Sequence, residues 1–323
     1  MKIAVTALVE PADRYDLLIY AIGYEARSTY VLKQGIRGAR SLGFAFTTST
    51  VMHFDANLAF AREHGSGILS PGSDVEFGSA VRSAVEVALQ GIEAPRICVD
   101  ISSFTRARIA RLLVEFEIAA KARPDMIVDF LYVPAAFEPP PEIGSAGVLS
   151  ASPVLARFRG SLRRASIPIA AVFGLGYELQ RAIGALELIE PSQAWAFVPS
   201  SDDPRFTDAV TDANRQLIAS IGSGACLPYP VLDPLESYYL LDSFLFSVRE
   251  WNRVVLLPMG PKIFALCCLI QGLSTAEARP AVWRVGARSE GLPLESEPRG
   301  QIVGLTVRFE PDLPAEGNQR REN

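Results

Sequence analysis

The tripeptide Gly-Tyr-Glu occurs twice, at residues 23–25 and 176–178, each time between an apolar run and a helical pattern. Such apolar runs are typical of buried β-strands. Glycine lets the backbone approach a ligand closely, and the following helix N-terminus presents free N–H groups to an anion. The tyrosines could stack on a base, and the glutamates could accept hydrogen bonds from a ribose hydroxyl or an exocyclic amine. Alternatively, the tyrosines pack against the protein and the glutamates only favour a helix N-terminus.

Arginines follow both triplets within three residues, as Arg27 and Arg181. Each could pair with the neighbouring glutamate or bind a phosphate. The second triplet lies in the run 174–179, which begins like the dinucleotide-binding pattern GxGxxG. However, Leu179 stands at the third glycine position, and no acidic residue ends the next strand. The dinucleotide fingerprint is therefore incomplete.

Two further loops follow apolar runs and carry charged or hydroxyl side chains, at residues 100–106 (Asp-Ile-Ser-Ser-Phe-Thr-Arg) and 258–262 (Pro-Met-Gly-Pro-Lys). Glycine, a proline in the first helical turn and an exposed lysine at the helix start would form a cradle for an anion at Gly260–Lys262. The first of these loops offers hydroxyls, a carboxylate and an arginine to phosphates or sugars. Alternatively, Ser103 or Thr105 only caps a helix.

The four loops belong to an order of elements that recurs along the chain at offsets of about 151–157 residues. The matched segments are 16–32 with 168–186, 43–50 with 194–201, 96–116 with 253–273, and 128–134 with 281–287. This recurrence predicts a tandem duplication, although any chain of alternating strands and helices repeats such units.

Alternating strands and helices predict an α/β fold of two Rossmann-like lobes with mainly parallel sheets, related by a pseudo-two-fold axis. We expect the first lobe over 1–150, with a Pro-rich linker from about 134, and the second over 165–309. Residues 310–323 are polar and contain Pro and Gly, which predicts a disordered tail.

Composition excludes several classes of function. The 323 residues are 49% hydrophobic, with 31 basic and 36 acidic side chains and a net charge of −5, so duplex nucleic acid is an unlikely partner. Only two histidines occur, His53 and His64, which we expect at the surface, and neither a metal site nor a cofactor is expected. Four cysteines without a CxxC pattern, no secretory leader and no long apolar run predict a cytoplasmic protein without membrane contact.

The order of loops resembles the CARF and SAVED domains, Rossmann-like sensors of cyclic or linear oligonucleotide second messengers in prokaryotic antiviral systems. SAVED domains look like two fused CARF units, which matches the duplication over about residues 14–305. The resemblance implies a ligand pocket lined by residues 23–28, 102–106, 174–178 and 260–262. The Gly-Thr-Lys-type turn of these families appears only as Gly-Pro-Lys in the second lobe, and no effector segment follows.

Three functions remain open. The first is a sensor that binds a nucleotide, an oligonucleotide or another phosphorylated small ligand between the lobes. The second is an enzyme on such a ligand, with Asp100, Glu25 and Glu178 as acid or base and Lys262 or Arg106 stabilising charge. The third is a structural subunit that binds other proteins of a defence complex. The candidate ligand-binding residues are Gly23, Tyr24, Glu25, Arg27, Ser28, Ser102, Ser103, Thr105, Arg106, Gly174, Gly176, Tyr177, Glu178, Arg181, Met259, Gly260, Pro261 and Lys262.

Overall fold

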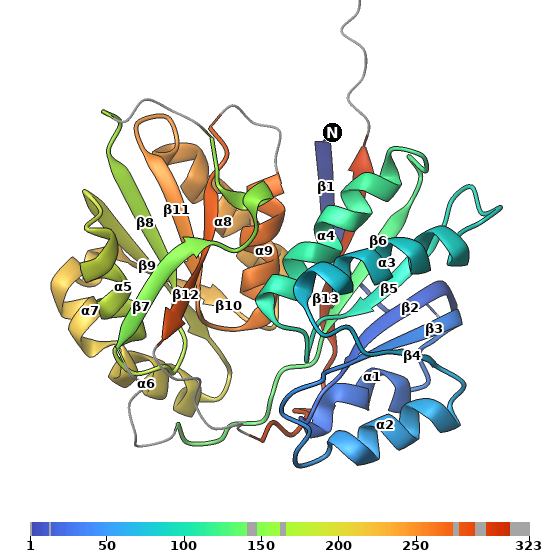
Figure 1. The fold of residues 1–323 in the computed structure, drawn as a ribbon. Helices are drawn as coiled ribbons and strands as arrows, with labels where there is room; N and C mark the ends of the chain where they lie inside the picture. Colours follow the sequence, from blue (N-terminus) through green and yellow to red (C-terminus); the bar gives the residue numbers. More distant parts are fainter. Residues whose placement is uncertain are drawn as a thin grey trace, which may run out of the picture.

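Two mainly parallel β-sheets, each flanked by helices, build the two lobes seen side by side in Figure 1. The computed structural model describes residues 2–12, 14–140, 147–161, 166–273, 278–287 and 295–310. The predicted α/β fold class with two Rossmann-like lobes is confirmed. Within the described residues, the strands of the first sheet are β1 (Lys2–Ala7), β2 (Arg14–Ile22), β3 (Arg37–Ala45), β4 (Gly67–Leu69), β5 (Arg96–Asp100), β6 (Ile127–Tyr132) and β13 (Val303–Glu310). Those of the second sheet are β7 (Val148–Pro153), β8 (Ile169–Gly174), β9 (Gln193–Ser200), β10 (Cys226–Pro230), β11 (Arg253–Pro258) and β12 (Ala281–Ala287).

The two sheets share one strand order. Five parallel strands run β4-β3-β2-β5-β6 in the first sheet and β10-β9-β8-β11-β12 in the second. An antiparallel strand then follows at the same side, β13 against β6 and β7 against β12. The shared order is consistent with a duplication, which stays a prediction because unrelated Rossmann-like sheets also share it.

Helices connect the parallel strands. Those of the first lobe are η1 (Ala26–Thr29), α1 (Tyr30–Lys33), α2 (Phe54–Glu63), α3 (Asp74–Ala88) and α4 (Arg106–Ala120). Those of the second lobe are η2 (Ala156–Phe158), α5 (Arg181–Ile189), α6 (Pro204–Ala213), α7 (Arg215–Ile221), η3 (Ser223–Ala225), α8 (Pro234–Val248) and α9 (Lys262–Leu273). In the part of the chain that the structure describes, none of them combines the length and apolar character that crossing a bilayer requires.

Local sequence signals account for where α8 begins. The Asp233 carboxylate accepts a hydrogen bond from the Glu236 amide at 2.9 Å, and Pro234 occupies the first helical turn. An aspartate at the cap and a proline in the first turn are both local sequence signals for a helix start. Ser73 caps α3 in the same way, by accepting from the Glu76 amide at 3.2 Å.

The hydrophobic core runs from one lobe into the other through α4 and α9, which pack against each other between the two sheets (Figure 1). Every residue of α9 after Lys262 is buried, and α4 contributes Ile109, Leu112 and Phe116 to the same cluster. A helix that is apolar around its whole circumference must be covered on all sides. The two lobes therefore share a hydrophobic core.

The chain crosses between the lobes differently from the predicted boundaries. β13 was expected in the second lobe, but it pairs with β6 and β1 of the first sheet. Its alternate residues Leu305, Val307 and Phe309 are fully buried, so β13 covers an otherwise open apolar edge. β7 precedes the expected start of the second lobe at 165 and already pairs with β12. Of the predicted disordered tail 310–323, Glu310 instead ends β13, and residues 311–323 lie outside the described residues.

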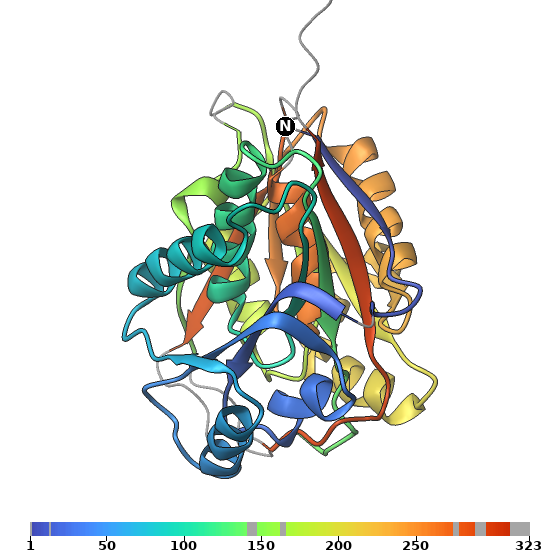
Figure 2. The same cartoon turned by 90° about the vertical axis from the view of Figure 1, so that its right-hand side faces the viewer.

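Two extended segments, residues 134–140 and 295–302, pass over the ends of the lobes, and we call them the strap (Figure 2). They are joined by hydrogen bonds from the Ala136 amide to the Glu297 carbonyl at 2.8 Å and from the Arg299 amide to the Pro134 carbonyl at 2.9 Å. Because the first segment follows β6 and the second precedes antiparallel β13, the strap lies at the carboxyl ends of the parallel strands. Ligands of open α/β sheets bind at these ends.

Candidate functional site

The loops at residues 100–106 and 258–262, both predicted to bind the ligand, face each other across the two lobes. The Arg106 guanidinium of the first lobe donates to the carbonyls of Met259 and Gly260, both at 2.5 Å. The Lys262 ammonium of the second lobe donates to the Ser102 carbonyl. These cations begin α4 and α9, the two helices at the centre of the molecule. Each of the two loops thus gives one cation to the opposite lobe.

Glu25 from the first Gly-Tyr-Glu triplet joins this contact. Its carboxylate accepts a hydrogen bond from Ser103 Oγ at 2.7 Å and two from Arg27 at 3.2 Å, and it lies 3.9 Å from Lys262 Nζ. Burial alone would raise the pKa of Glu25, but Lys262, Arg27 and the hydrogen bond from Ser103 together lower it to about 2. We call Glu25, Arg27, Asp100, Ser103, Arg106 and Lys262 the inter-lobe cluster.

Lys262 is not exposed as predicted, because the loop of the opposite lobe covers it. Its side chain keeps only 20% of its accessible surface. Burial, with smaller contributions from the positive charges of Arg27 and Arg106, lowers the pKa of the Lys262 ammonium to about 8, although Glu25 and Asp100 favour its charged form. A position at a helix start does not reveal that another lobe packs over it.

Asp100 is the second carboxylate of the cluster and is 2% exposed. One carboxylate oxygen accepts from the Ser102 amide at 2.9 Å and from Ser102 Oγ at 2.5 Å. The other oxygen has no hydrogen-bond partner among the described residues. Burial raises the pKa of Asp100 to about 6, although Ser102, Arg27 and Lys262 favour the charged form. A buried carboxyl oxygen without a partner is costly for a fold to keep.

Several predicted ligand residues hold the first loop in shape. Ser28 Oγ donates to the Ala21 carbonyl at 2.7 Å and accepts from the Gly23 amide at 2.9 Å, and its side chain is buried. Arg27 donates to the Val133 carbonyl at 2.9 Å. Thr105 is exposed, and it caps α4 by accepting from the Arg108 amide at 3.2 Å. For Thr105, the structure therefore agrees with the alternative interpretation that this residue only caps a helix.

The second Gly-Tyr-Glu triplet has a different environment. Glu178 pairs with Arg181 of its own lobe at 3.4 Å and keeps 32% of its side-chain surface. Tyr177 packs against the apolar cluster of its lobe, as half-buried Tyr24 does in the first lobe. Both tyrosines thus pack against the protein, which was the alternative to stacking on a base. The Tyr177 ring also stacks on the Phe206 ring, with 6.2 Å between the ring centroids. Phe137 of the strap packs edge-on against Phe206, with 5.1 Å between the ring centroids.

Glycines of the second lobe allow its two loops to touch. A Cβ on Gly260 would lie 2.0 Å from the Leu175 carbonyl oxygen, and one on Gly176 would lie 2.8 Å from the Met259 carbonyl oxygen. A Cβ on Gly174 would meet the Phe264 ring at 2.7 Å. Glycine was predicted here for approach to a ligand, and in this structure the neighbour that approaches is the protein itself.

A pair of asparagines outside the prediction fixes both triplets. Asn57 Nδ2 donates to the carbonyls of Gly23 at 3.0 Å and Glu25 at 2.9 Å, and Asn214 Nδ2 donates to the Gly176 carbonyl at 2.8 Å. Both side chains are buried. The sequence carried a signal for them, since Asp-Ala-Asn occurs at residues 55–57 and again at 212–214.

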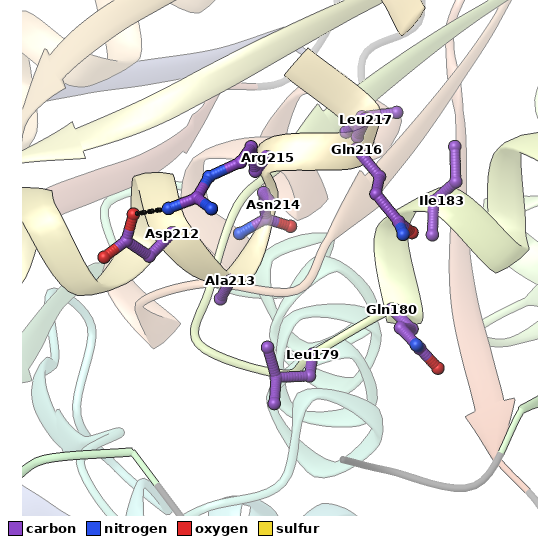
Figure 3. A pocket seen from close by; sticks show the side chains of 9 residues that line it. All are labelled: Leu179, Gln180, Ile183, Asp212, Ala213, Asn214, Arg215, Gln216 and Leu217. Atoms are coloured by element: carbon purple, nitrogen blue, oxygen red, sulfur yellow. Dashed lines mark hydrogen bonds and ion pairs between the residues drawn. The ribbon is translucent and has the colours of Figure 1, made fainter. Parts of the chain in front are cut away.

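Surface pockets lie beside both triplets. In the second lobe, Gln180, Ile183 and Asn214 help to line a pocket of about 230 Å³ between the start of α5 and the junction of α6 and α7 (Figure 3). In the first lobe, Asn57 and Lys33 line one of about 380 Å³. These pockets recur at matching places, outside the inter-lobe cluster.

Comparison with known proteins adds little to this description. No protein-family model matches the sequence, and no curated protein matches it. A similar solved structure is titled "Adenylation, ketoreductase, and pseudo Asub multidomain structure of a keto acid-selecting NRPS module". It is 8% identical with a TM-score of 0.20, and the match covers 87% of this chain and 34% of that one. The chain thus spans about a third of that protein, and a likeness this low carries no argument.

Proposed function

We propose that this protein binds an anionic ligand, a nucleotide or oligonucleotide second messenger, between its two lobes at the inter-lobe cluster. The observation that carries the proposal is the exchange of Arg106 and Lys262 between the lobes. Each cation begins a central helix at the carboxyl end of its sheet, and each donates to backbone carbonyls of the opposite lobe. Phosphate oxygens would be stronger acceptors than these carbonyls, because a full negative charge strengthens the hydrogen bonds.

The unpartnered polar atoms support the same proposal. Asp100 Oδ2 and Arg106 Nε are both buried without a hydrogen-bond partner among the described residues. A ligand that carries phosphates and hydroxyls or amines would supply an acceptor for the arginine and a donor for the carboxylate. Because the ligand would replace contacts that now join the lobes, binding would change how the lobes are held together. This is the property that a sensor requires.

The proposed setting is prokaryotic antiviral defence in the cytoplasm, with other protein subunits as recipients of the signal. The resemblance to CARF and SAVED domains supports it, together with two sheets of one strand order. The four cysteines are free thiols, three of them buried, which suits a reducing compartment. The proposal requires no cofactor.

Calorimetry against mononucleotides, dinucleotides and cyclic oligonucleotides tests the proposal on the full chain. We expect saturable binding of at least one member, and loss of that binding in the double variant Arg106→Ala/Lys262→Ala. Lys121→Ala is the control, because Lys121 is an exposed cation at the other end of α4. Absence of binding by every member at millimolar concentration would contradict the proposal.

A second candidate is an enzyme on the same ligand. Its specific support is that Glu25 and Asp100 have pKa values displaced in opposite directions, to about 2 and about 6. With these values Glu25 stays ionised, whereas Asp100 can exchange a proton near neutral pH and so serve as an acid or a base. Product formation that Asp100→Asn abolishes while binding persists would favour this candidate. Ligand recovered unchanged after long incubation would exclude it.

A further inference from the structure

One group of side chains outside the inter-lobe cluster has the composition of a metal site. His53, Glu295 and Glu297 each offer a ligand atom, and these atoms lie within 4.8 Å of one another. His53 precedes α2, whereas both glutamates belong to the strap, so the chain brings them together from distant positions. We propose that His53, Glu295 and Glu297 bind a divalent transition-metal ion, with Zn²⁺ as the best match.

The distances within the group suit such an ion. His53 Nε2 lies 3.1 Å from Glu295 Oε2. Two ligands bonded to zinc at about 2.1 Å in tetrahedral geometry are roughly 3.4 Å apart, so this pair needs little adjustment. Glu297 is exposed, and a rotation of its side chain can bring the third oxygen closer.

Glu295 is already oriented as a ligand. Its Oε1 atom accepts the amides of Ala26 and Ser296, both at 3.0 Å, which leaves Oε2 directed at His53. Hydrogen bonds of this kind to the second oxygen of a ligand carboxylate fix its orientation in metal sites. His53 is held at its backbone, where its amide donates to the Tyr24 carbonyl at 3.2 Å.

The charge of the group favours a divalent ion. Glu295 and Glu297 are two residues apart on an extended segment, so their side chains point to the same side. Two carboxylates and a neutral imidazole carry a charge of −2, which one divalent ion balances. Nitrogen and oxygen ligands together suit Zn²⁺ and other first-row ions better than Mg²⁺.

A bound ion would fasten the strap to the first lobe. Four residues after Glu295, the same segment contacts the second lobe, where Arg299 donates to Ser201 at 3.1 Å and pairs with Asp202. The metal would therefore complete a connection between the lobes at the carboxyl ends of the strands. This site does not depend on the inter-lobe cluster or on its proposed ligand.

The chain offers a matched control because it has only two histidines. His53 directly precedes α2 and His64 directly follows it, and both are exposed. At 1.5 Å per helical residue, about 16 Å separates the two histidines along the helix. Its ring stacks on Phe60 at 3.9 Å, and its Nδ1 is 2.8 Å from the Phe60 carbonyl. His64→Ala thus removes an imidazole without removing a proposed ligand.

The test is calorimetry of Zn²⁺ against the full chain without a polyhistidine tag, with His53→Ala, Glu297→Gln and His64→Ala. We expect one Zn²⁺ per chain, affinity reduced by at least about tenfold in the first two variants, and unchanged affinity in His64→Ala. In the unmodified protein, Co²⁺ should broaden the NMR signals of His53 before those of His64. Absence of saturable binding, or equal losses in the two histidine variants, would overturn the proposal.

Discussion

The two Gly-Tyr-Glu triplets occupy the same place in two sheets of the same strand order, yet their glutamates have different surroundings. Glu25 lies among Arg27, Ser103 and Lys262 with 14% of its side chain exposed, whereas Glu178 pairs with Arg181 of its own lobe and keeps 32%. The difference shows that matching sequence and topology do not give two equivalent sites. The first lobe supplies the carboxylates of the inter-lobe cluster, and the second supplies its lysine.

The largest expected effect comes from removing the buried glutamate. Glu25→Ala leaves Arg27 and Lys262 without their carboxylate, so we expect a loss of about 3–5 kcal/mol in the free energy of unfolding. Glu178→Ala, the matched change in the second lobe, removes a partly exposed pair and should cost less than about 1 kcal/mol. Chemical denaturation of both variants measures the difference. Equal losses would mean that the two triplets are energetically equivalent.

The asparagines should show a smaller asymmetry. Asn57→Ala leaves the Gly23 carbonyl without a donor and the buried Thr29 hydroxyl without its acceptor, while the Glu25 carbonyl keeps the Ser28 amide at 3.0 Å. The expected cost is about 2–4 kcal/mol. Asn214→Ala leaves the single Gly176 carbonyl without its donor, with an expected cost of about 1–3 kcal/mol. The same unfolding measurement checks the order of the two. A larger loss for Asn214→Ala would contradict the hydrogen-bonding pattern described here.

Asp100 should make stability depend on pH in the opposite sense to Glu25. Burial raises the pKa of Asp100 from 3.8 to about 6 in the folded protein, so the folded state binds the extra proton between these values. Its contribution to stability is therefore lost as the pH rises from about 4 to about 6. For Glu25, whose pKa is lowered from 4.5 to about 2, stability is lost as the pH falls through that range.

Unfolding of Asp100→Asn measured between pH 4 and pH 6 isolates the first contribution. The amide does not titrate, so the variant should lose the decline in stability that Asp100 causes in this window. Identical pH profiles for the variant and the parent would show that Asp100 is ionised in the folded protein throughout.

The smallest expected effect concerns the backbone after the second triplet. Gln180 has a φ of +59°, in the left-handed region, at the start of α5. Gln180→Gly should relieve this strain and stabilise the protein by about 0.5–1 kcal/mol. The corresponding change in the first lobe, Arg27→Gly, removes a buried cation and should destabilise. A destabilised Gln180→Gly protein would show that the glutamine side chain itself holds the loop.

The parts of the fold that depend on local patterns could be predicted from the sequence. Apolar runs marked β2, β5, β8 and β11, and the cap at Asp233 marked the start of α8. The pairing of β13 with β6 could not be predicted, because 170 residues lie between the two strands. A local sequence pattern can indicate a strand, but it does not indicate which distant strand it pairs with. The strap follows from that same pairing.

In the candidate site, too, the features set by local sequence patterns could be predicted, and those set by the packing of distant segments could not. The four loops were identified because each follows a strand, and three of them do meet at the inter-lobe cluster through Glu25, Ser102, Arg106, Gly260 and Lys262. The burial of Lys262 depends on how two lobes pack, which no spacing reveals. The repeated Asp-Ala-Asn was available in the sequence, but asparagine hydrogen bonds to the backbone leave no pattern typical of chemistry. The proximity of His53 to Glu295 depends on the strap.

The affinity of Lys262→Ala for the nucleotide that binds the parent protein most tightly tests the central claim most directly. Loss of a charge-assisted contact worth roughly 1.5–3 kcal/mol predicts affinity about 10- to 150-fold weaker. Lys262→Arg should recover only part of it, because a planar guanidinium does not fit the space of a compact ammonium. Lys121→Ala should bind as the parent does. If Lys262→Ala also binds as tightly as the parent, the two lobes do not hold their ligand through this lysine, and the proposed site is wrong.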